Sequence, residues 1–437
     1  MESGSSPPSP GVAPVTLSHC ISELVRFILS LHLEETQEFD LGLTKDYCFS
    51  LLKEQEPVTL HPPHHCLDGD TFAGVPPYPL YNQLASAIDQ CISSNSVEEI
   101  SESIWKWGDE ALISKKNEWQ KLIMYEGSQL VKMLQGVNYE LHVQEPFYSL
   151  LRVGRKTIEG RCAIGNYKQI SSGDMLLINK CLILEVQDVK WYSSFYDMME
   201  AEGLEKVLPG VKTLDEGVGI YRRFYTQEKE KCQGVLGICV SRPSAQPYIS
   251  MANIISGLGY EGVGKLLGLR HTTGTVLDGL PPPRSELLSS FLMPYTPNAK
   301  GNLLTVGARA LAKHVSRCGK GWWGRLNRND SHKNALALEV IFHITTHACW
   351  MNIHIVKPHG AVFEIRVTEG YGARWSGDGS RFIGFLEPHM DDGHSVGNTR
   401  NSQLFSLRET LSLYPDVEQS DCKFSANHHD CNPLSLV

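Results

Sequence analysis

Hydrophobic residues recur at helical spacing through the first part of the chain. In the stretch SHCISELVRFILSLHLEE they fall three and four positions apart, at Ile21, Leu24, Val25, Ile28 and Leu29. This period places them on one face of a helix. A later stretch rich in Pro and Gly, residues 56–79, has no such period and predicts a loop. We therefore expect a helical module over residues 14–136, ended by Gly136, after a disordered lead at residues 1–13.

The pattern changes to short strand-like segments after Gly136. Five such segments follow, at residues 139–143, 157–161, 174–179, 181–192 and 234–242. Helical spacing interrupts them at residues 147–153 and between residues 193 and 225. Short strands with inserted helices favour a small mixed β-barrel over a βαβ sheet. We place this barrel domain at residues 137–243, followed by a helix and a Pro-rich linker at residues 244–300.

A third folded unit is predicted at residues 301–390. Two helical faces come first, with hydrophobic positions at Leu304, Ala308, Leu311 and Val315, and at Leu336, Val340, Ile341 and Ile344. Strand-like segments follow at residues 361–368, 370–376 and 380–387, the last two joined by a hairpin signal, Asp378-Gly379. We expect two helices against a three-stranded antiparallel sheet, and a flexible tail at residues 391–437. The fold class of the whole chain is α+β.

Composition places the chain among globular proteins of the cell interior. Of its 437 residues, 41% are hydrophobic and 20% charged, and the formal net charge is -9. The 12 cysteines show no CxxC spacing, which favours free thiols in a reducing compartment. The sequence contains neither a secretory signal nor an apolar run long enough to span a bilayer. We therefore expect an intracellular protein, in the nucleus or the cytoplasm, that has no membrane partner.

The stretch GRKTIEGR, which begins at Gly154, concentrates charge within a few residues. Because side chains alternate along a strand, Glu159 and Arg161 should share one face, with Lys156 at the turn that leads in. Two cations around a carboxylate can bind a phosphate or the polar edge of a base. The alternative is that Glu159 and Arg161 pair only with each other and close the barrel, as ion pairs often do without any function.

These residues carry a resemblance to the ASCH family, whose signature is G-x-K-x-x-E-x-R after a short helix. Gly154, Lys156, Glu159 and Arg161 fill its four positions. The resemblance covers roughly residues 138–242. It implies a PUA-like barrel that binds RNA or another nucleic acid, often in coactivator or RNA-processing contexts, with the four signature residues at the ligand site.

Some small members of the ASCH family are amidohydrolases that deacylate a modified cytidine. The resemblance implies Lys156 and Glu202 as the catalytic pair if this chain shares that activity. Those enzymes have a Thr three residues after the Lys, whereas this chain has Glu159 there. A carboxylate cannot replace the hydroxyl nucleophile that the Lys would activate. We therefore expect binding rather than catalysis, with amidohydrolysis of an acylated nucleoside as the alternative.

The third unit carries a basic stripe in an otherwise acidic chain. Arg309, Lys313 and Arg317 recur every four residues on the polar face of the predicted helix, and Trp322 and Trp323 follow. Cations beside aromatic rings can bind the backbone and an unstacked base of single-stranded nucleic acid. The alternative is a solvated helix face, with the tryptophans in the core.

A pair of histidines on the next predicted helix offers a weaker signal. His343 and His347 are four positions apart, a spacing that can place two imidazoles on one metal ion. Ile344 stands where the metalloprotease motif has its Glu, so we expect no metal and no cofactor.

Together these patterns predict a protein that binds RNA or single-stranded nucleic acid. The signature residues would line the cleft, and the basic stripe would contact phosphates. The protein would then act as an adaptor or coactivator in RNA metabolism. A second alternative is a protein-interaction adaptor that binds a partner through residues 14–136 and whose barrel is only structural.

Overall fold

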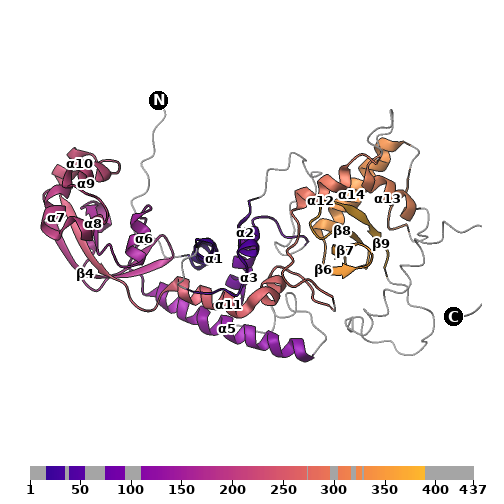
Figure 1. Ribbon diagram of the computed structural model, residues 1–437, viewed down its shortest axis with the longest axis horizontal. Coiled ribbons are helices and arrows are strands. Elements are labelled where there is room, and N and C mark those ends of the chain that lie inside the picture. Colours follow the sequence, from indigo (N-terminus) through magenta and orange to yellow (C-terminus); the bar gives the residue numbers. More distant parts are fainter. Residues whose placement is uncertain are drawn as a thin grey trace, which may run out of the picture. The chain divides into compact units, whose positions relative to one another are not determined.

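The computed structural model divides the chain into two compact units (Figure 1). It describes residues 16–34, 39–54, 74–93, 110–272, 274–295, 304–315, 321–326 and 329–388. Unit 1 comprises residues 1–55, 77–100 and 119–267, and unit 2 comprises residues 56–76, 101–118 and 268–437. The lead and the tail expected at the two ends lie outside the described residues, as does Arg317.

Helices form the first part of unit 1, as the hydrophobic spacing predicts. They are α1 (Leu17–Leu33), α2 (Lys45–Leu52), α3 (Leu80–Ser93), α5 (Glu110–Gln135, in unit 1 from residue 119 on) and, later in the chain, α11 (Pro247–Leu266). The five periodic residues of α1, from Ile21 to Leu29, are fully buried. Helices α2, α3 and α11 all pack against α1, so the stripe read from the sequence is the centre of this helical layer.

The middle of unit 1 is a five-stranded sheet that curls into a half-barrel. Its strands are β1 (Tyr139–Leu141), β2 (Ile158–Cys162), β3 (Met175–Ile178), β4 (Leu182–Tyr192) and β5 (Val235–Ser241), in the order β1-β3-β4-β5-β2. Neighbouring strands are antiparallel except the parallel pair β1–β3. The α+β class is confirmed, but the barrel is only half formed, because the edge strands β1 and β2 each pair on one side only.

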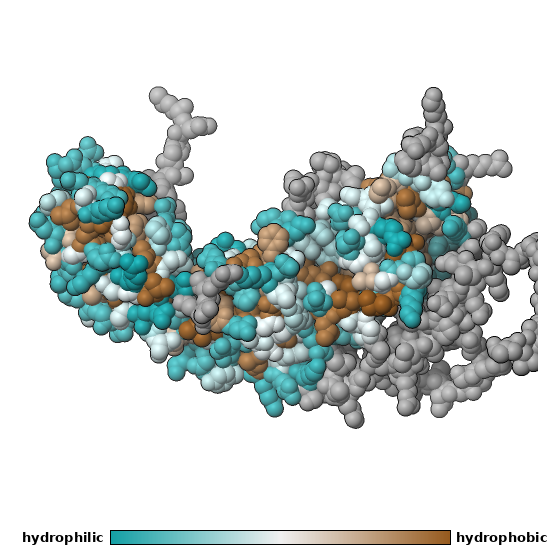
Figure 2. All heavy atoms as spheres, viewed as in Figure 1, coloured by the Kyte–Doolittle hydropathy of each residue, from teal (hydrophilic) through white to brown (hydrophobic). Residues whose placement is uncertain are grey.

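Short helices connect and flank the strands of this sheet, and α7, α8 and α10 pack directly against them. They are α6 (Phe147–Arg152), the 3-10 helix η1 (Gly165–Gln169), α7 (Phe195–Glu202), α8 (Leu204–Val207), α9 (Leu214–Tyr221) and α10 (Gln227–Gln233). The single helical stretch expected from residue 193 is broken at Gly203 and Gly210, whose φ angles of 91° and 87° favour glycine. Figure 2 shows hydrophilic residues over much of the visible surface around α7–α10.

Unit 2 places helices on one face of a four-stranded antiparallel sheet. The helices are α12 (Arg284–Leu292), α13 (Val306–Val315) and α14 (Asp330–Thr346), and the strands β6 (Trp350–Val356), β7 (Gly360–Arg366), β8 (Gly372–Ser376) and β9 (Phe382–Leu386) follow in spatial order. The sequence predicted only the last three strands. β6 escaped notice because buried polar residues, Asn352 and His354, alternate with its hydrophobic ones.

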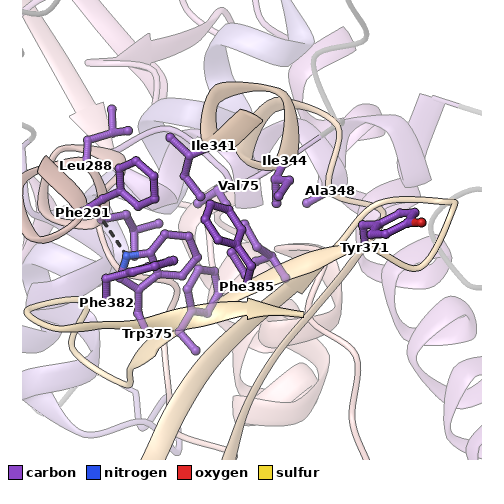
Figure 3. Close-up of a cluster of buried hydrophobic side chains, with 14 of the residues drawn as sticks. Val75, Leu288, Phe291, Ile341, Ile344, Ala348, Tyr371, Trp375, Phe382 and Phe385 are labelled. Atoms are coloured by element: carbon purple, nitrogen blue, oxygen red, sulfur yellow. Dashed lines mark hydrogen bonds between the residues drawn. The ribbon is translucent and has the colours of Figure 1, made fainter. Parts of the chain in front are cut away.

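The core of unit 2 lies between these helices and the sheet (Figure 3). Part of it comes from the expected Pro-rich linker, since α12 lies there and buries Leu287 and Phe291 completely. Trp375 is also fully buried, and its Nε1 donates to the carbonyl of Leu287 at 3.1 Å. With the helices on one face, the other face of the sheet carries the polar residues of the strands.

Candidate functional site

The ASCH signature residues meet in one ion-pair cluster on β2. Lys156 Nζ lies 3.1 Å from Glu159 Oε2, and Arg161 Nη2 lies 2.9 Å from Glu159 Oε1. Gly154, with a φ of 74°, ends α6 and turns the chain toward β2. The side chains of Lys156 and Glu159 are only 1% and 9% exposed, and that of Arg161 is 15% exposed. The ion pair considered as the structural alternative is therefore present.

The ammonium of Lys156 is fully engaged inside the protein. Besides Glu159, it donates to the carbonyls of Ile158 at 2.6 Å and Val207 at 2.5 Å. Burial lowers the pKa of Lys156, while the charge of Glu159 opposes this effect. Because an ammonium has three donors, Lys156 has none left for a ligand. Its contact with Val207 joins α8 to β2, so Lys156 holds the site together rather than reaching outward.

Glu159 and Arg161 stay ionised in this cluster. Burial would raise the pKa of Glu159, but the charges of Lys156 and Arg161 outweigh it and lower that pKa. Arg161 also donates from Nη2 to the His142 carbonyl at 2.7 Å, and its guanidinium lies 5.8 Å from the centre of the Tyr167 ring. Two cations against one carboxylate leave the cluster with a net positive charge, and Arg161 is its most exposed member.

Glu202, the second residue of the amidohydrolase alternative, has other partners than Lys156. It ends α7, where its Oε1 lies 2.8 Å from Lys190 Nζ and accepts a hydrogen bond from the hydroxyl of Tyr192. Burial would raise the pKa of Glu202, but these two hydrogen bonds lower it. Glu202 is thus a carboxylate held by Lys190 and Tyr192, which is not the arrangement of a catalytic Lys–Glu pair.

In unit 2, α13 carries the described part of the basic stripe. Lys313 is exposed, whereas the half-buried Arg309 lies 5.4 Å from the centre of the Tyr295 ring. Trp323 is fully buried and belongs to the core, as the structural alternative proposed. Trp322 stacks on Tyr371 with the ring centres 4.2 Å apart.

Next to Lys313, the structure reveals a His–Glu dyad that the sequence reading missed. His314 Nδ1 lies 2.8 Å from Glu387 Oε1, and Trp323 Nε1 donates to the same oxygen at 2.8 Å. The rings of Trp323 and Phe385 flank the imidazole, with centres 5.3 Å and 6.0 Å away. The side chains of His314 and Glu387 are 20% and 39% exposed. Because 73 residues separate the two, no local motif could indicate the pair.

A second charged cluster occupies the polar face of the unit 2 sheet. Glu364 on β7 lies between Asn352 on β6 and Arg374 on β8 in the strand register. Its Oε2 accepts from Arg374 Nη2 at 2.7 Å and lies 3.3 Å from His354 Nε2. Its Oε1 accepts from Arg366 Nε at 2.8 Å. One carboxylate is thus surrounded by an imidazole and two guanidinium groups.

Most of this cluster is buried, and its carboxylate is ionised. The side chain of Glu364 is 1% exposed, and those of His354 and Arg374 are each 6% exposed. Burial would raise the pKa of Glu364, but the hydrogen bond with His354 and the charges of Arg366 and Arg374 hold it well below the usual range. Arg366, at 27%, is the most exposed member and leads from the cluster toward the surface.

The histidine pair of α14 stacks instead of converging on a common point. The ring centres of His343 and His347 are 4.5 Å apart, and burial together with His347 lowers the pKa of His343. Within the described ranges, no three His, Cys, Asp or Glu residues come together in a way that could hold a metal ion. None of the described helices is long and apolar enough to cross a membrane.

Comparison with known proteins identifies the central domain. Residues 141–244 match the family model described as the ASCH domain. Through these residues, the chain belongs to the ASCH family. Two similar solved structures are the hypothetical protein PH0355, a crystal structure, and protein PF0455 from Pyrococcus furiosus, an NMR structure. Each shares 42% identity, with 24% of this chain and 97% of the other covered, at TM-scores of 0.24 and 0.23. Among curated proteins, none matches this chain.

The ASCH domain indicates RNA binding at the level of the family. A second family model, described as the CdiA C-terminal tRNase toxin domain, matches residues 295–387. This range spans α13, α14 and the whole sheet of unit 2, and it includes both residues of the His314–Glu387 dyad.

Proposed function

We propose that this protein binds RNA through its ASCH domain and cleaves RNA through unit 2. The observation that carries the cleavage step is the solvent-accessible His314–Glu387 dyad, in which a carboxylate fixes one nitrogen of an imidazole. A likeness to a tRNase toxin domain over the same residues supports a phosphodiester in RNA as the bond that is cut. The competing function is the non-catalytic RNA-binding adaptor expected from the sequence.

The dyad suits proton transfer. With Nδ1 of His314 donating to Glu387, Nε2 carries the lone pair, a tautomer assigned from the partner of the ring. Nε2 would take the proton of an RNA 2′-hydroxyl as its oxygen attacks the adjacent phosphorus. The new 2′-O–P bond forms as the P–O5′ bond breaks, and the 5′-oxygen takes up a proton from water. The products are a 2′,3′-cyclic phosphate and a free 5′-hydroxyl, and Glu387 stabilises the imidazolium.

Basic residues on the same helix supply charge for the phosphate. Lys313 precedes His314 and is exposed, and Arg309 lies one turn earlier on α13. Cations that face a phosphate stabilise the negative charge that develops on it, and they attract RNA despite the acidic balance of the chain. The basic stripe read from the sequence thus lies on the same helix as His314.

The Glu364 cluster is a second candidate centre within unit 2. A carboxylate, an imidazole and two guanidinium groups are also the types of group that RNA cleavage requires. However, a substrate must reach the reacting groups, and the side chains of Glu364 and His354 are 1% and 6% exposed. We therefore assign proton transfer to His314 and a structural role to Glu364.

A cleavage assay with the full chain tests the assignment. Unfractionated tRNA and a 5′-labelled single-stranded RNA are incubated with the protein in excess EDTA, and the 2′,3′-cyclic phosphate ends are quantified. Cleavage by the wild type should persist in EDTA and fall by about 10²-fold or more in His314→Ala. His347→Ala, an exposed histidine outside both clusters, serves as the matched control and should retain activity.

Two outcomes would contradict the proposal in different ways. If His354→Ala abolishes cleavage in a folded protein while His314→Ala does not, the reaction centre is the Glu364 cluster. If the wild type binds RNA in fluorescence-anisotropy titrations but forms no cyclic phosphate, the protein is an RNA-binding adaptor. Titration at two salt concentrations gives the number of phosphate contacts in either case.

A further inference from the structure

An exposed tryptophan lies on the sheet face that carries the ASCH signature. Trp191 on β4 is 57% exposed, which is unusual for so large a hydrophobic side chain. It pairs across β5 with Leu236, and Leu236 pairs on its other side with Arg161 of β2. Directly paired residues in antiparallel strands project to the same face, so Trp191 and Arg161 flank Leu236 on one face.

The opposite face of these strands is closed by helices. A Cβ atom added at Gly160 would meet Met198 Cε of α7 at 2.6 Å, and one at Gly237 would meet Met198 Cγ at 3.3 Å. Gly160 and Gly237 alternate with Arg161 and Leu236 along their strands, so the helical layer covers the face away from Trp191. Trp191 and Arg161 therefore project from the face of the sheet opposite α7.

The spacing of the two side chains fits a nucleic-acid strand. Strands lie about 4.8 Å apart, so the backbones at Trp191 and Arg161, two strands apart, are separated by about 10 Å. Single-stranded nucleic acid binds where aromatic rings stack on bases while cations contact the backbone. Arg161, the most exposed residue of the signature cluster, supplies the cation, and the indole of Trp191 lies on the same face.

We propose that Trp191 stacks on an unpaired nucleobase of the RNA bound by the ASCH domain, and so selects single strands over duplexes. This inference rests on the proposed RNA binding and names the kind of RNA that the site takes. In a duplex the bases already stack on one another and cannot lie flat on the indole. The stacking does not depend on the cleavage proposed for unit 2.

The competing explanation is that Trp191 only covers the hydrophobic sheet. Its Cε3 lies 3.8 Å from the position of a Cβ atom at Gly234, and Leu236 beside it is 1% exposed. In that case, truncating Trp191 would lower the melting temperature without changing the affinity for RNA. The two explanations thus predict different measurements on the same variant.

The test compares Trp191→Ala and Trp191→Phe with two matched controls in the full chain. Tyr196→Ala and Phe224→Ala remove other exposed aromatic rings of unit 1, which are 40% and 50% exposed. Fluorescein-labelled oligouridine and an RNA duplex of equal length are titrated by anisotropy, and thermal unfolding is followed for each variant. Trp191→Ala should weaken oligouridine binding at least about tenfold, the range expected for one lost base stack.

The remaining expectations separate this inference from the proposed function. Trp191→Phe should recover most of the affinity, the two controls should bind as the wild type does, and duplex binding should be weaker and insensitive to Trp191. Oligouridine binding that is unchanged in Trp191→Ala overturns the inference and leaves RNA binding intact. If the wild type binds neither probe at low salt, the RNA-binding part of the proposed function fails, and the inference fails with it.

Discussion

Arg366 connects the buried carboxylate of Glu364 to the backbone of Glu387. Its Nε donates to Glu364 Oε1 at 2.8 Å, and its Nη1 donates to the Glu387 carbonyl at 3.1 Å. Nη1 also donates to the Gly370 carbonyl at 2.8 Å. The Glu364 cluster on the sheet therefore fixes the position of the segment that supplies the carboxylate of the dyad. We interpret Glu364 and Arg366 as the frame for His314 and Glu387.

The first prediction concerns this frame. Glu364→Gln leaves Arg374 buried beside a neutral amide, and breaking a buried ion pair in this way costs about 3–5 kcal/mol. The effect should appear as a lower urea midpoint for the unfolding transition of unit 2, followed by near-UV circular dichroism. Glu339→Gln, which changes an exposed glutamate of α14, should leave the midpoint unchanged. Equal midpoints for the two variants would show that Glu364 contributes nothing to the frame.

The same carboxylate predicts a pH dependence of stability. The pKa of Glu364 in the folded protein lies well below its ordinary value of 4.5. Its contribution to the free energy of unfolding is therefore complete above pH 4.5 and is lost as the pH falls toward the folded value. The difference between wild type and Glu364→Gln should shrink between pH 5 and pH 3. A difference that stays constant over this range would contradict an ionised Glu364.

Lys156 of the ASCH signature yields a prediction about stability instead of contact with RNA. Lys156→Met removes a buried charge that joins β2 to α8 and should destabilise unit 1 by about 3 kcal/mol. Arg155→Ala breaks an ion pair with Glu205 whose side chains are 61% and 67% exposed, so it should leave the stability nearly unchanged. Denaturation curves of the two neighbouring variants check this contrast. If Lys156→Met is as stable as wild type but binds RNA poorly, this prediction is wrong and Lys156 contacts the ligand.

Sequence reasoning found the parts of the fold that repeat over short distances. The α1 stripe, the five strands of the ASCH sheet and the last three strands of unit 2 all follow from local periodicity. β6 was missed because His354 and Asn352 are polar residues in buried positions, and their partners come from other segments. The spacing of hydrophobic residues along the sequence can indicate a buried strand only when the buried residues are themselves hydrophobic.

The candidate sites also differ in whether their residues lie close together in the sequence. The signature on β2 is local, so its residues could be grouped from the sequence, although the complete engagement of Lys156 could not be foreseen. The His314–Glu387 dyad joins a helix to the end of β9, and only the packing of unit 2 brings the two together. His314 directly follows Lys313 of the basic stripe. A single histidine does not indicate a catalytic site in a sequence when its carboxylate partner is unknown.

A fourth prediction uses the close approach of β2 to the helical layer. A Cβ atom at Gly160 would lie 2.5 Å from the hydroxyl of Tyr221 and 2.6 Å from Met198 Cε, so Gly160→Ala should cost about 1–3 kcal/mol. At Gly219 on α9 an added Cβ atom meets nothing within 4 Å, so Gly219→Ala should be neutral or stabilising by up to about 1 kcal/mol. Thermal unfolding of the two variants tests this order, and a Gly160→Ala protein as stable as Gly219→Ala would contradict the packing.

The last prediction tests the dyad through its carboxylate. Glu387→Gln keeps the size of the side chain but removes the charge that orients His314 and stabilises the imidazolium. RNA cleavage should therefore slow by about 10²-fold at saturating RNA, while the Kd for RNA stays within about twofold of wild type. Glu369→Gln, which changes an exposed carboxylate in the β7–β8 turn, is the matched control and should cleave normally. Wild-type rates in Glu387→Gln would contradict this role and show that Glu387 only anchors Trp323. The Glu364 cluster would then be the candidate for proton transfer.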